Sequence, residues 1–457
     1  MSGLLAGSGS GERKWQYPLI RKGVYYKWRN WLSYAYLIFF FAGPFLRIGG
    51  QPFLLLDFVN KHFVILGQAF WPQDIFLFML ASLVFIVCVV LFTIAFGRMF
   101  CGWICPQTIF MEMVFRKIEI WIEGDANKRK KLDAGPLTNE KLFKKTAKHV
   151  LFFLVSFLIA NTFLAYLTGS ENLIKIIAEP VNKHWVGFAS IFVFTTIFYL
   201  IYSRVRELVC TVICPYGRLQ SVLIDKDTLV VAYNDVRGEP RGKLMRVLDP
   251  LNQKGDCVDC GLCVGVCPTG IDIRNGTQIE CINCTICIDA CDHVMDKISK
   301  PRNLIGYFSE NMIHAQKKAT FTNRMKGYAA VIVLLIGVLC YFIFSRKDLD
   351  MTVMRGAGML YQQQQDGYIS NIYNAEIINK TNGLQQITLK AEDPAIKIKY
   401  IQAPAIIKKG EETKAVFFVM IPAKNIRSPK TEVRLQLLLG NKIIQTVTTS
   451  FVGPISD

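Results

Sequence analysis

The sequence predicts a multi-domain membrane protein: an α-helical transmembrane bundle of about five helices, a cysteine-rich insert and a C-terminal all-β domain. Three observations support this prediction, namely apolar stretches of membrane length, two closely spaced runs of cysteines, and a tail of short alternating segments. The chain has 457 residues, enough for several folding units, and 52% of them are hydrophobic, a high share for a soluble protein. A membrane location is the simplest interpretation of this composition.

Five stretches are predicted to cross the membrane, because each offers close to the ~20 mainly apolar residues that a helical crossing requires. The first is shortened by Pro44 and Arg47, which a helix end at the membrane interface tolerates. The five are residues 31–46, 75–96, 150–168, 185–202 and 327–344.

The basic residues are distributed as membrane topology would place them. The net charge is +18, yet Lys and Arg gather before the first stretch and between the second and third, while the loops after the first and third carry two each. This positive-inside pattern predicts a cytoplasmic N-terminus and makes a nucleic-acid partner unnecessary. The predicted domains are a basic cytoplasmic N-terminus (1–30), a four-helix membrane region (31–203), a cytoplasmic segment (204–326) that contains the cysteine-rich insert (about 250–300), a fifth helix (327–345) and an outer β domain (346–457).

Two runs of cysteines have the spacing C-x-x-C-x-x-C-x-x-x-C, which is typical of bacterial ferredoxins with two 4Fe-4S clusters. In that arrangement three close thiolates bind one cluster and the fourth cysteine serves the other. Structural zinc usually pairs two C-x-x-C elements, and disulfides are rare in a reducing cytoplasm, so both alternatives fit less well. The predicted ligands are Cys257, Cys260, Cys263 and Cys291 for one cluster, and Cys267, Cys281, Cys284 and Cys287 for the other.

The insert is therefore expected to relay single electrons, which requires a donor and an acceptor. The second run departs from the usual pattern because Asp292, rather than proline, follows its last cysteine. That difference removes no ligand.

A second group of cysteines lies in two C-x-x-x-C-P motifs, each of which closes a pair of predicted crossings. Residues i and i+4 share a helix face, and the residue before a proline leaves the helical region, so each motif presents two thiols at a helix end. Four such thiols could bind a soft metal such as Cu(I) or form a reversible dithiol pair, and Arg98 and Arg206 nearby would favour thiolates. The alternative is that they pack as small apolar side chains. The thiols are Cys101 and Cys105 in the first motif, and Cys210 and Cys214 in the second.

The tail is predicted to form a small antiparallel β-sandwich. Residues 414–420 and 433–439 alternate between apolar and polar side chains, and turn residues such as Asn382-Gly383 and Gly440-Asn441 separate such segments.

Together these features resemble one family, the cytochrome c oxidase accessory proteins called CcoG, FixG or RdxA, and the resemblance covers nearly the whole chain. The motifs that carry it are Trp71-Pro-Gln-Asp74, Gly97-Arg98, Cys101-Gly-Trp-Ile-Cys105-Pro-Gln-Thr108, Trp121-Ile-Glu-Gly-Asp125, Cys214-Pro-Tyr-Gly217, Asp225-Lys-Asp-Thr228, Arg237-Gly-Glu-Pro-Arg-Gly242, residues 256–273 and Asp366-Gly-Tyr-Ile-Ser-Asn371.

The resemblance implies a protein of the bacterial inner membrane with a periplasmic immunoglobulin-like C-terminal domain. It also implies a role in assembling the cbb3-type haem-copper oxidase: reduction of Cu(II) to Cu(I), with copper handled by the C-x-x-x-C-P thiols and electrons supplied through the ferredoxin clusters. The implied partners are a cytoplasmic electron donor, copper ions, and oxidase subunits or copper chaperones.

Two other functions stay open at this point. The membrane half could exchange electrons with quinol or quinone, as related membrane ferredoxins with the same thiol motifs are believed to do. Alternatively, the chain could be an oxidase assembly scaffold whose clusters are structural and whose outer β domain docks onto a partner.

Overall fold

The structure of the protein is a computed structural model, and it divides into two units, Met1–Leu339 and Cys340–Asp457, each described here by itself. The structure describes residues 15–20, 22–58, 62–70, 74–243, 254–318, 320–345, 349–356, 360–364, 366–379, 387–403, 407, 412–426, 428–440 and 442–454. Parts of the predicted features lie outside these residues: the tripeptide Trp71-Pro-Gln73, the Asn382-Gly383 turn, Asn441, and the basic residues Arg13, Lys14 and Arg21.

Four helices of the described chain are long and apolar enough to cross a membrane. The most apolar, α2, has a mean hydropathy of 3.2 and no charged residue, and it ends at Gly97, whose φ of +55° lies in the left-handed region that glycine adopts without strain. The four are α2 (Ile75–Phe96), α7 (Asn139–Thr168), α9 (Trp185–Leu200) with its π-helical continuation η4 (Ile201–Val205), and α15 (Asn323–Phe344).

The predicted first crossing, residues 31–46, is not among these four. The chain instead forms helix α1 over Val24–Ala42, followed by a 3-10 turn, η1, over Gly43–Phe45. The helix begins earlier than expected, with Lys27 and Arg29 in its first turns, and ends before Pro44, which lacks the N–H that would continue it. A fifth crossing therefore stays a prediction, and so does the membrane orientation.

The position of α1 nevertheless agrees with a crossing. The carboxylate of Asp289, in the ferredoxin segment (residues 254–300), accepts hydrogen bonds from the first-turn N–H groups of Tyr25 and Tyr26 at 3.1 and 2.8 Å. At the other end, the Tyr166 hydroxyl donates to the Phe40 carbonyl at 3.0 Å, near the C-terminus of α7. A helix of 19 residues spans about 28 Å, close to a hydrocarbon core of ~30 Å.

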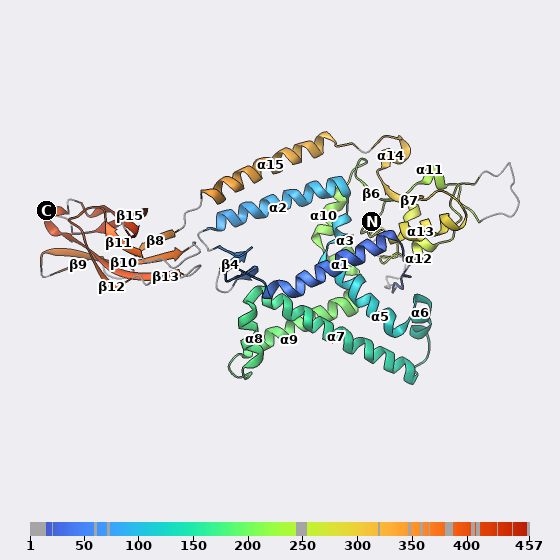
Figure 1. The fold of residues 1–457 in the computed structure, drawn as a ribbon, viewed down its shortest axis with the longest axis horizontal. Coiled ribbons are helices and arrows are strands. Elements are labelled where there is room, and N and C mark those ends of the chain that lie inside the picture. The colour runs from blue at the N-terminus through green and yellow to red at the C-terminus, as the bar shows by residue number, and fades with distance from the viewer. Residues whose placement is uncertain are drawn as a thin grey trace. The chain divides into compact units, whose positions relative to one another are not determined.

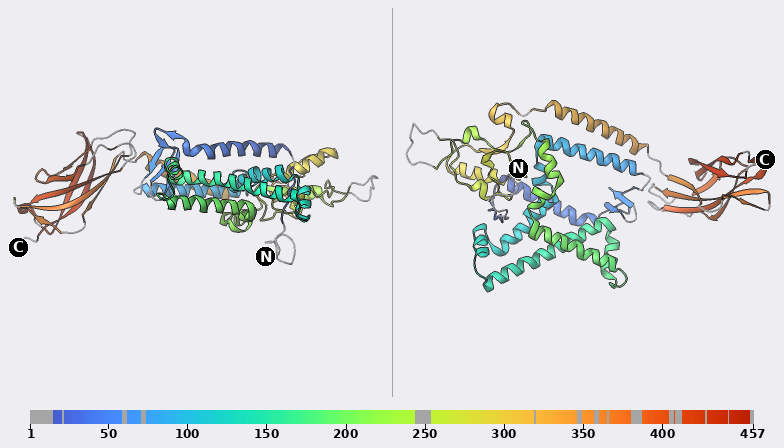
Figure 2. Two further views of the ribbon diagram at one scale, coloured as in Figure 1. Left: turned by 90° about the horizontal axis from the view of Figure 1, so that it is seen from below. Right: turned by 180° about the vertical axis from the view of Figure 1, so that it is seen from behind.

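Within the first unit, strands β1–β5 and the ferredoxin segment lie at opposite ends of α1 (Figures 1 and 2). Strands β6 and β7 pair antiparallel beside the ferredoxin segment. The strands are β1 (Arg47–Ile48), β2 (Gln51–Pro52), β3 (Leu54–Asp57), β4 (His62–Ile65), β5 (Gln68–Phe70), β6 (Val230–Tyr233) and β7 (Ile305–Phe308).

Short helices join the membrane-length ones, and most of them build the end where the cysteines lie. An aromatic core holds one of them, η3, to α7 and η4, with Phe115 stacked on Tyr202 at 4.3 Å between ring centroids and edge-on to Phe152 at 4.9 Å. These helices are α3 (Met99–Trp103), α4 (Pro106–Thr108), η3 (Ile109–Phe115), α5 (Arg116–Glu123), α6 (Ala126–Ala134), α8 (Ser170–Ala178), η5 (Val209–Ile213), α10 (Pro215–Leu223), α11 (Asp235–Gly238), α12 (Leu262–Gly265), η6 (Ile273–Asn275), α13 (Ile286–Lys297) and α14 (Glu310–His314).

The second unit is the predicted all-β sandwich. One sheet has the strand order β12-β13-β10-β8, with β9 also paired to β10, and the other has the order β11-β14-β15. Tyr373 and Phe417, both fully buried, face each other in the β10–β13 register within the core between the sheets. The strands are β8 (Leu349–Arg355), β9 (Gln362–Gln363), β10 (Tyr368–Asn379), β11 (Ile387–Ala391), β12 (Lys397–Gln402), β13 (Glu412–Pro422), β14 (Lys430–Leu439) and β15 (Lys442–Val452), and a 3-10 turn, η7 (Ala423–Asn425), follows β13.

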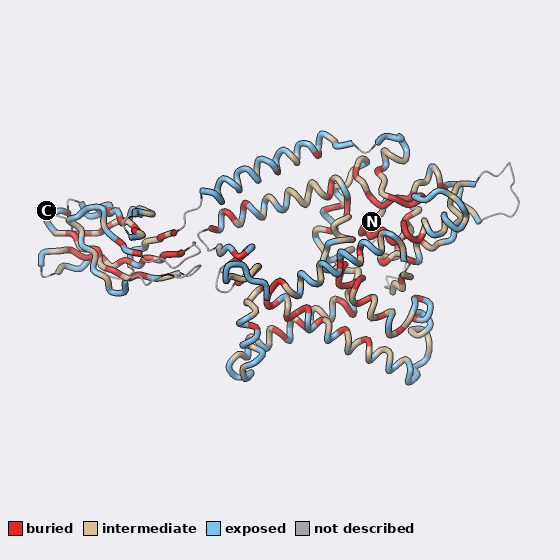
Figure 3. The backbone as a smooth tube through the Cα atoms, in the orientation of Figure 1, coloured by how far each residue is buried: buried red, intermediate tan, exposed pale blue. Residues whose placement is uncertain are grey.

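Burial separates lipid-facing helices from the packed region of the first unit. In Figure 3, α2 is mostly intermediate or exposed, whereas buried residues gather around α3, η3, α5 and the ferredoxin segment. Exposed apolar side chains along membrane-length helices are expected where lipid replaces protein as the neighbour. The predicted fold class, a membrane-helix bundle with a ferredoxin insert and an all-β C-terminal domain, is confirmed with four membrane-length helices.

Candidate functional site

The two ferredoxin-type cysteine runs adopt the same local structure twice. Asp259 and Asn283 both have a φ of +51°, and Gly261 and Thr285 both have a φ of +65° immediately before α12 and α13. A left-handed φ is uncommon for residues other than glycine, so its recurrence at positions 24 residues apart marks two copies of one motif. This is the duplication that the spacing of the cysteines predicts.

Two cavities lie among these cysteines, and each is lined by one of the predicted ligand sets. Four thiols around an otherwise largely apolar cavity are the donor set that a 4Fe-4S cluster takes, so the residues present fit such a group. The assignment of individual ligands stays a prediction. The first cavity is lined by Cys257, Cys260, Cys263 and Cys291, and the second by Cys267, Cys281, Cys284 and Cys287, with Cys263 also reaching it.

Burial raises the pKa of several of these thiols, which favours their protonated form when no metal is bound. It raises the pKa of the Cys263 thiol to about 11 and that of the Cys281 thiol to about 12. A metal that binds the thiolates replaces the protons, so loading the site releases protons and stabilises the folded segment.

The two C-x-x-x-C-P motifs also share one local structure. Cys105 and Cys214 are extended, as expected before proline, and their prolines begin α4 and α10. The N–H of Cys105 donates to the Phe100 carbonyl at 3.0 Å, and the N–H of Cys214 donates to the Val209 carbonyl at 2.7 Å. Both bonds span five residues, so the two motifs are structural repeats.

The fold brings the four thiols of these motifs together into what we call the thiol quartet: Cys101, Cys105, Cys210 and Cys214. Burial, and then the neighbouring thiols of the quartet, raise the pKa of Cys210 to about 12, and burial raises that of Cys101 to about 11. The Cys101 thiol also donates to the Gln220 side-chain carbonyl at 3.4 Å. Among the described residues, no three His, Cys, Asp or Glu side chains converge closely enough to hold a single metal ion.

The quartet lies directly against the loop that carries ligands of the second cavity. A Cβ added to Gly102 would lie 2.4 Å from the Ile282 carbonyl oxygen and 2.9 Å from the Asn283 carbonyl carbon, so only glycine fits between Cys101 and this loop. Ile282 and Asn283 are the two residues between Cys281 and Cys284. In addition, Cys101, Cys210, Cys284 and Cys287 all belong to one apolar cluster.

Two buried arginines flank this contact. Arg98 is 3% exposed, and its Nε and one Nη have no hydrogen-bond partner among the described residues. Burial lowers the pKa of Arg98, while the nearby thiols of Cys101 and Cys281 act in the opposite direction. Arg29 is 2% exposed and donates from Nε to the Gly102 carbonyl at 3.2 Å. Two buried guanidinium groups therefore lie at the contact between the thiol motif and the ferredoxin segment, and the Glu280 carboxylate is also within electrostatic reach of Arg98.

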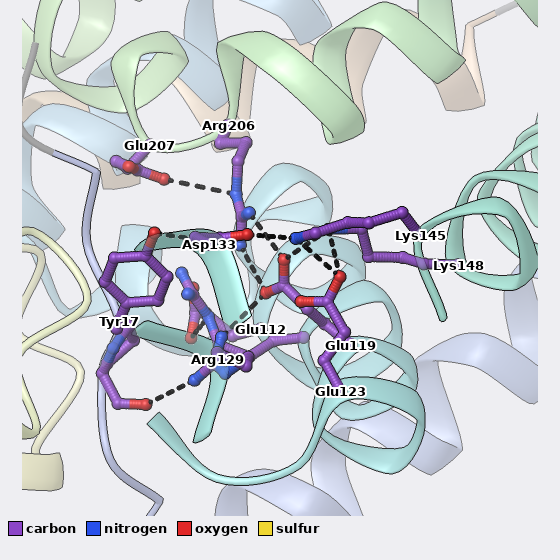
Figure 4. A network of polar contacts seen from close by, with 12 residues as sticks. Tyr17, Glu112, Glu119, Glu123, Arg129, Asp133, Lys145, Lys148, Arg206 and Glu207 are labelled. Atoms are coloured by element: carbon purple, nitrogen blue, oxygen red, sulfur yellow. Dashed lines mark hydrogen bonds and ion pairs between the residues drawn. The ribbon is translucent and has the colours of Figure 1, made fainter. Parts of the chain in front are cut away.

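Arg206, which the sequence suggested would favour thiolates, instead forms an ion pair with a carboxylate. Its two Nη atoms donate to the oxygens of Glu119 at 3.0 and 2.9 Å, with both side chains buried (Figure 4). Arg129 and Lys148 also pair with Glu119, at 2.9 and 3.7 Å. Burial alone would raise the pKa of Glu119, but Arg206, Arg116 and Lys148 hold it at about 2.

This ion network joins the two halves of the membrane region. Glu119 lies in α5, which follows the first thiol motif, whereas Arg206 immediately precedes the second. Arg206 also has a φ of +55°, like Gly97 at the equivalent place in the first repeat. The surrounding contacts therefore hold a non-glycine residue in a conformation that costs free energy on its own.

The segment of residues 15–20 joins the membrane region to the ferredoxin segment. The Trp15 ring stacks on the Arg206 guanidinium at 4.8 Å, and the Tyr17 hydroxyl donates to Asp133 at 2.6 Å. The Leu19 N–H donates to the Gly265 carbonyl at 2.9 Å, and its side chain packs against the cluster that contains Cys101 and Cys210.

Comparison with known proteins places this architecture in a family. The RdxB protein of Cereibacter sphaeroides is 33% identical over 437 residues, which cover 91% of each chain. The chain belongs to the FixG/RdxA family. Other FixG/RdxA relatives are FixG of Rhizobium meliloti, 32% identical over 83% of this chain and 76% of that one, and RdxA of Cereibacter sphaeroides, 33% identical over 81% and 80%.

Models of protein families divide this FixG/RdxA chain in the same way as the structure does. A 4Fe-4S dicluster domain matches residues 205–310, a further 4Fe-4S binding domain matches residues 78–128, and the immunoglobulin-like fold at the C-terminus of FixG matches residues 339–454. A crystal structure of a FixG-related protein from Vibrio parahaemolyticus is similar over 23% of this chain and 97% of that one, at 20% identity and a TM-score of 0.20. The chain is therefore an iron-sulfur, multi-pass membrane protein.

Proposed function

We propose that this chain is a membrane-bound iron-sulfur oxidoreductase that reduces Cu(II) to Cu(I) and supplies Cu(I) for the assembly of a cbb3-type cytochrome c oxidase. The observation that carries the proposal is the packing of Gly102 on the backbone of Ile282 and Asn283, because it sets the thiol quartet against a predicted cluster-ligand loop. Bound 4Fe-4S clusters supply one-electron chemistry. Reduction of Cu(II) to Cu(I) takes one electron and no proton.

The residues around the quartet suit copper as the substrate. Thiolates prefer the soft Cu(I) ion to Cu(II), so thiols at the point of reduction favour the product. The buried positive charge of Arg98 lies within electrostatic reach of Cys101 and Cys210 and opposes the cost of burying thiolates there. The ion pair between Glu119 and Arg206 holds the two thiol motifs in register.

The proposed topology places the N-terminus and the ferredoxin segment in the cytoplasm and the immunoglobulin-like unit in the periplasm. A cytoplasmic carrier would then donate electrons to the ferredoxin segment, where Cys260 is the exposed member of the predicted ligands. Oxidase subunits or copper chaperones are the proposed partners for the Cu(I) product.

An anaerobic assay tests the function on the cluster-loaded, full-length protein. The chemically reduced protein is mixed with Cu(II), and Cu(I) is trapped by a chelator, for the wild type and for the Cys101→Ser/Cys210→Ser variant. The proposal expects Cu(I) to form at a rate that depends on the two thiols, with reoxidation of the clusters in step.

Equal rates in the two proteins would reject the quartet as the place of copper reduction. In that case a quinone analogue in the same assay shows whether electrons leave to quinone. No reoxidation by either acceptor would instead favour the scaffold role.

A further inference from the structure

Residues 78–128 match a family model for a 4Fe-4S binding domain, yet they contain too few cysteines to hold a 4Fe-4S cluster alone. This stretch has three, Cys88, Cys101 and Cys105, whereas a 4Fe-4S cluster takes four thiolates. Cys88 lies within α2, eight residues before the helix ends at Phe96, so the helix alone carries it about 12 Å from the motif. Two ligands at most come from this segment, and the others must come from elsewhere in the chain.

The second thiol motif is placed to supply them. Cys210 and Cys214 repeat the local structure of Cys101 and Cys105 at an offset of 109 residues, including the five-residue backbone hydrogen bond to the second cysteine. All four thiols lie within electrostatic reach of one another, and Cys101 and Cys210 pack in one apolar cluster. From this we propose that the thiol quartet holds a third 4Fe-4S cluster, shared between the two halves of the membrane region; Cu(II) would then take its electron beside this cluster and not as an ion bound by the four thiolates.

A single metal ion is a poor fit to the quartet. Thiolates around one tetrahedral ion lie about 4 Å apart, since each metal–sulfur bond is ~2.3 Å. Among the described residues, no three ligand side chains converge closely enough for one ion. Neither the quartet nor the eight cysteines of the ferredoxin segment contain such a group. The quartet therefore resembles those two sites in having no three ligand side chains close enough for a single ion.

The buried positive charge near the quartet also favours a negatively charged cluster. Arg98 is almost fully buried, with two guanidinium nitrogens that have no hydrogen-bond partner among the described residues. A buried cation is costly unless its N–H groups are paired, and Glu280 lies within electrostatic reach of Arg98 without filling them. Four thiolates around a 4Fe-4S core carry net negative charge, which would add to the compensation of Arg98.

Iron content tests this inference and does not depend on whether copper is the acceptor. Full-length protein is reconstituted anaerobically, and iron and sulfide are counted per chain. We expect about twelve irons in the wild type and about eight in Cys101→Ser/Cys210→Ser. The matched control Cys88→Ser, a cysteine outside the quartet, should retain about twelve, and Cys260→Ser/Cys284→Ser, which removes one ligand from each ferredoxin cluster, should retain about four.

About eight irons in the wild type would overturn the proposal, and so would one copper per chain held through the quartet in place of iron. If twelve irons are found and Cu(II) is not reduced, only the copper function fails. If copper is reduced by a protein with eight irons, only the third cluster fails.

Discussion

Replacing Gly102 by alanine tests the contact on which the proposed electron route depends. The added Cβ would lie 2.4 Å from the Ile282 carbonyl oxygen, whereas ordinary contact begins near 3.4 Å, so the two backbones must separate by about 1 Å. Neither neighbour is a flexible side-chain end, and overpacking of this kind typically costs about 1–3 kcal/mol. We expect the ferredoxin segment to lose that much stability against unfolding and the reduction of Cu(II) to slow.

The assay has two readouts. Loss of cluster absorbance during anaerobic denaturant unfolding reports the stability of the segment, and Cu(I) trapping reports the rate. Gly102 supplies no ligand, so iron content should not change. The matched control is Gly265→Ala, whose added Cβ meets only the end of the Leu19 side chain at an ordinary 3.5 Å. If both variants keep wild-type stability and rate, the tight contact has no role in either.

Four further predictions follow from the buried charges and the metal-binding segment. Glu119→Gln leaves buried cations without their carboxylate and should cost about 3–5 kcal/mol in thermal or denaturant unfolding, whereas Glu140→Gln at an exposed helix pair should change little. The folded-state pKa of Glu119, about 2, lies below its usual 4.5, so its contribution to the free energy of unfolding is complete above pH 4.5 and is lost as the pH falls toward 2. A pH series of unfolding midpoints should show this loss in the wild type and not in Glu119→Gln. Asp289→Ala removes the acceptor for the first turn of α1 and should cost about 1 kcal/mol, while Asp289→Asn, which keeps one oxygen, should cost less in the same unfolding assay. Stripping iron with a chelator should expose residues 255–297 to limited proteolysis and leave the immunoglobulin-like unit intact, since that unit has its own core.

The sequence predicted the parts of the fold that local patterns determine. Continuous apolar stretches identified α2, α7, α9 and α15, and the cysteine spacing identified the duplicated ferredoxin loops. The first helix was harder to predict because its first turns carry Lys27 and Arg29 beside aromatic residues, so its ends depend on contacts with distant residues rather than on composition.

The relation between the thiol motifs and the ferredoxin segment was not predictable from spacing. In the sequence, Gly102 is only a glycine between two cysteines. The reason for a glycine there is the Ile282 backbone packed against it, which the sequence does not reveal. Likewise, Arg98 and Arg206 precede their motifs in similar ways, yet Arg98 lies near thiols and Arg206 pairs with Glu119. A charge near a cysteine in sequence does not reveal which partner it meets in space.

The hydrogen bonds from α1 to Asp289 have a consequence for the order in which the protein is made. The first turn of α1 is completed by a residue 264 positions later in the chain, so this helix leaves the ribosome long before its cap exists. Asp289 lies between Cys287 and Cys291, which are predicted to ligate different clusters. The first turn of α1 is thus completed only after translation has reached the second cysteine run, although contacts with Gly102 and Tyr166 can hold the rest of the helix earlier.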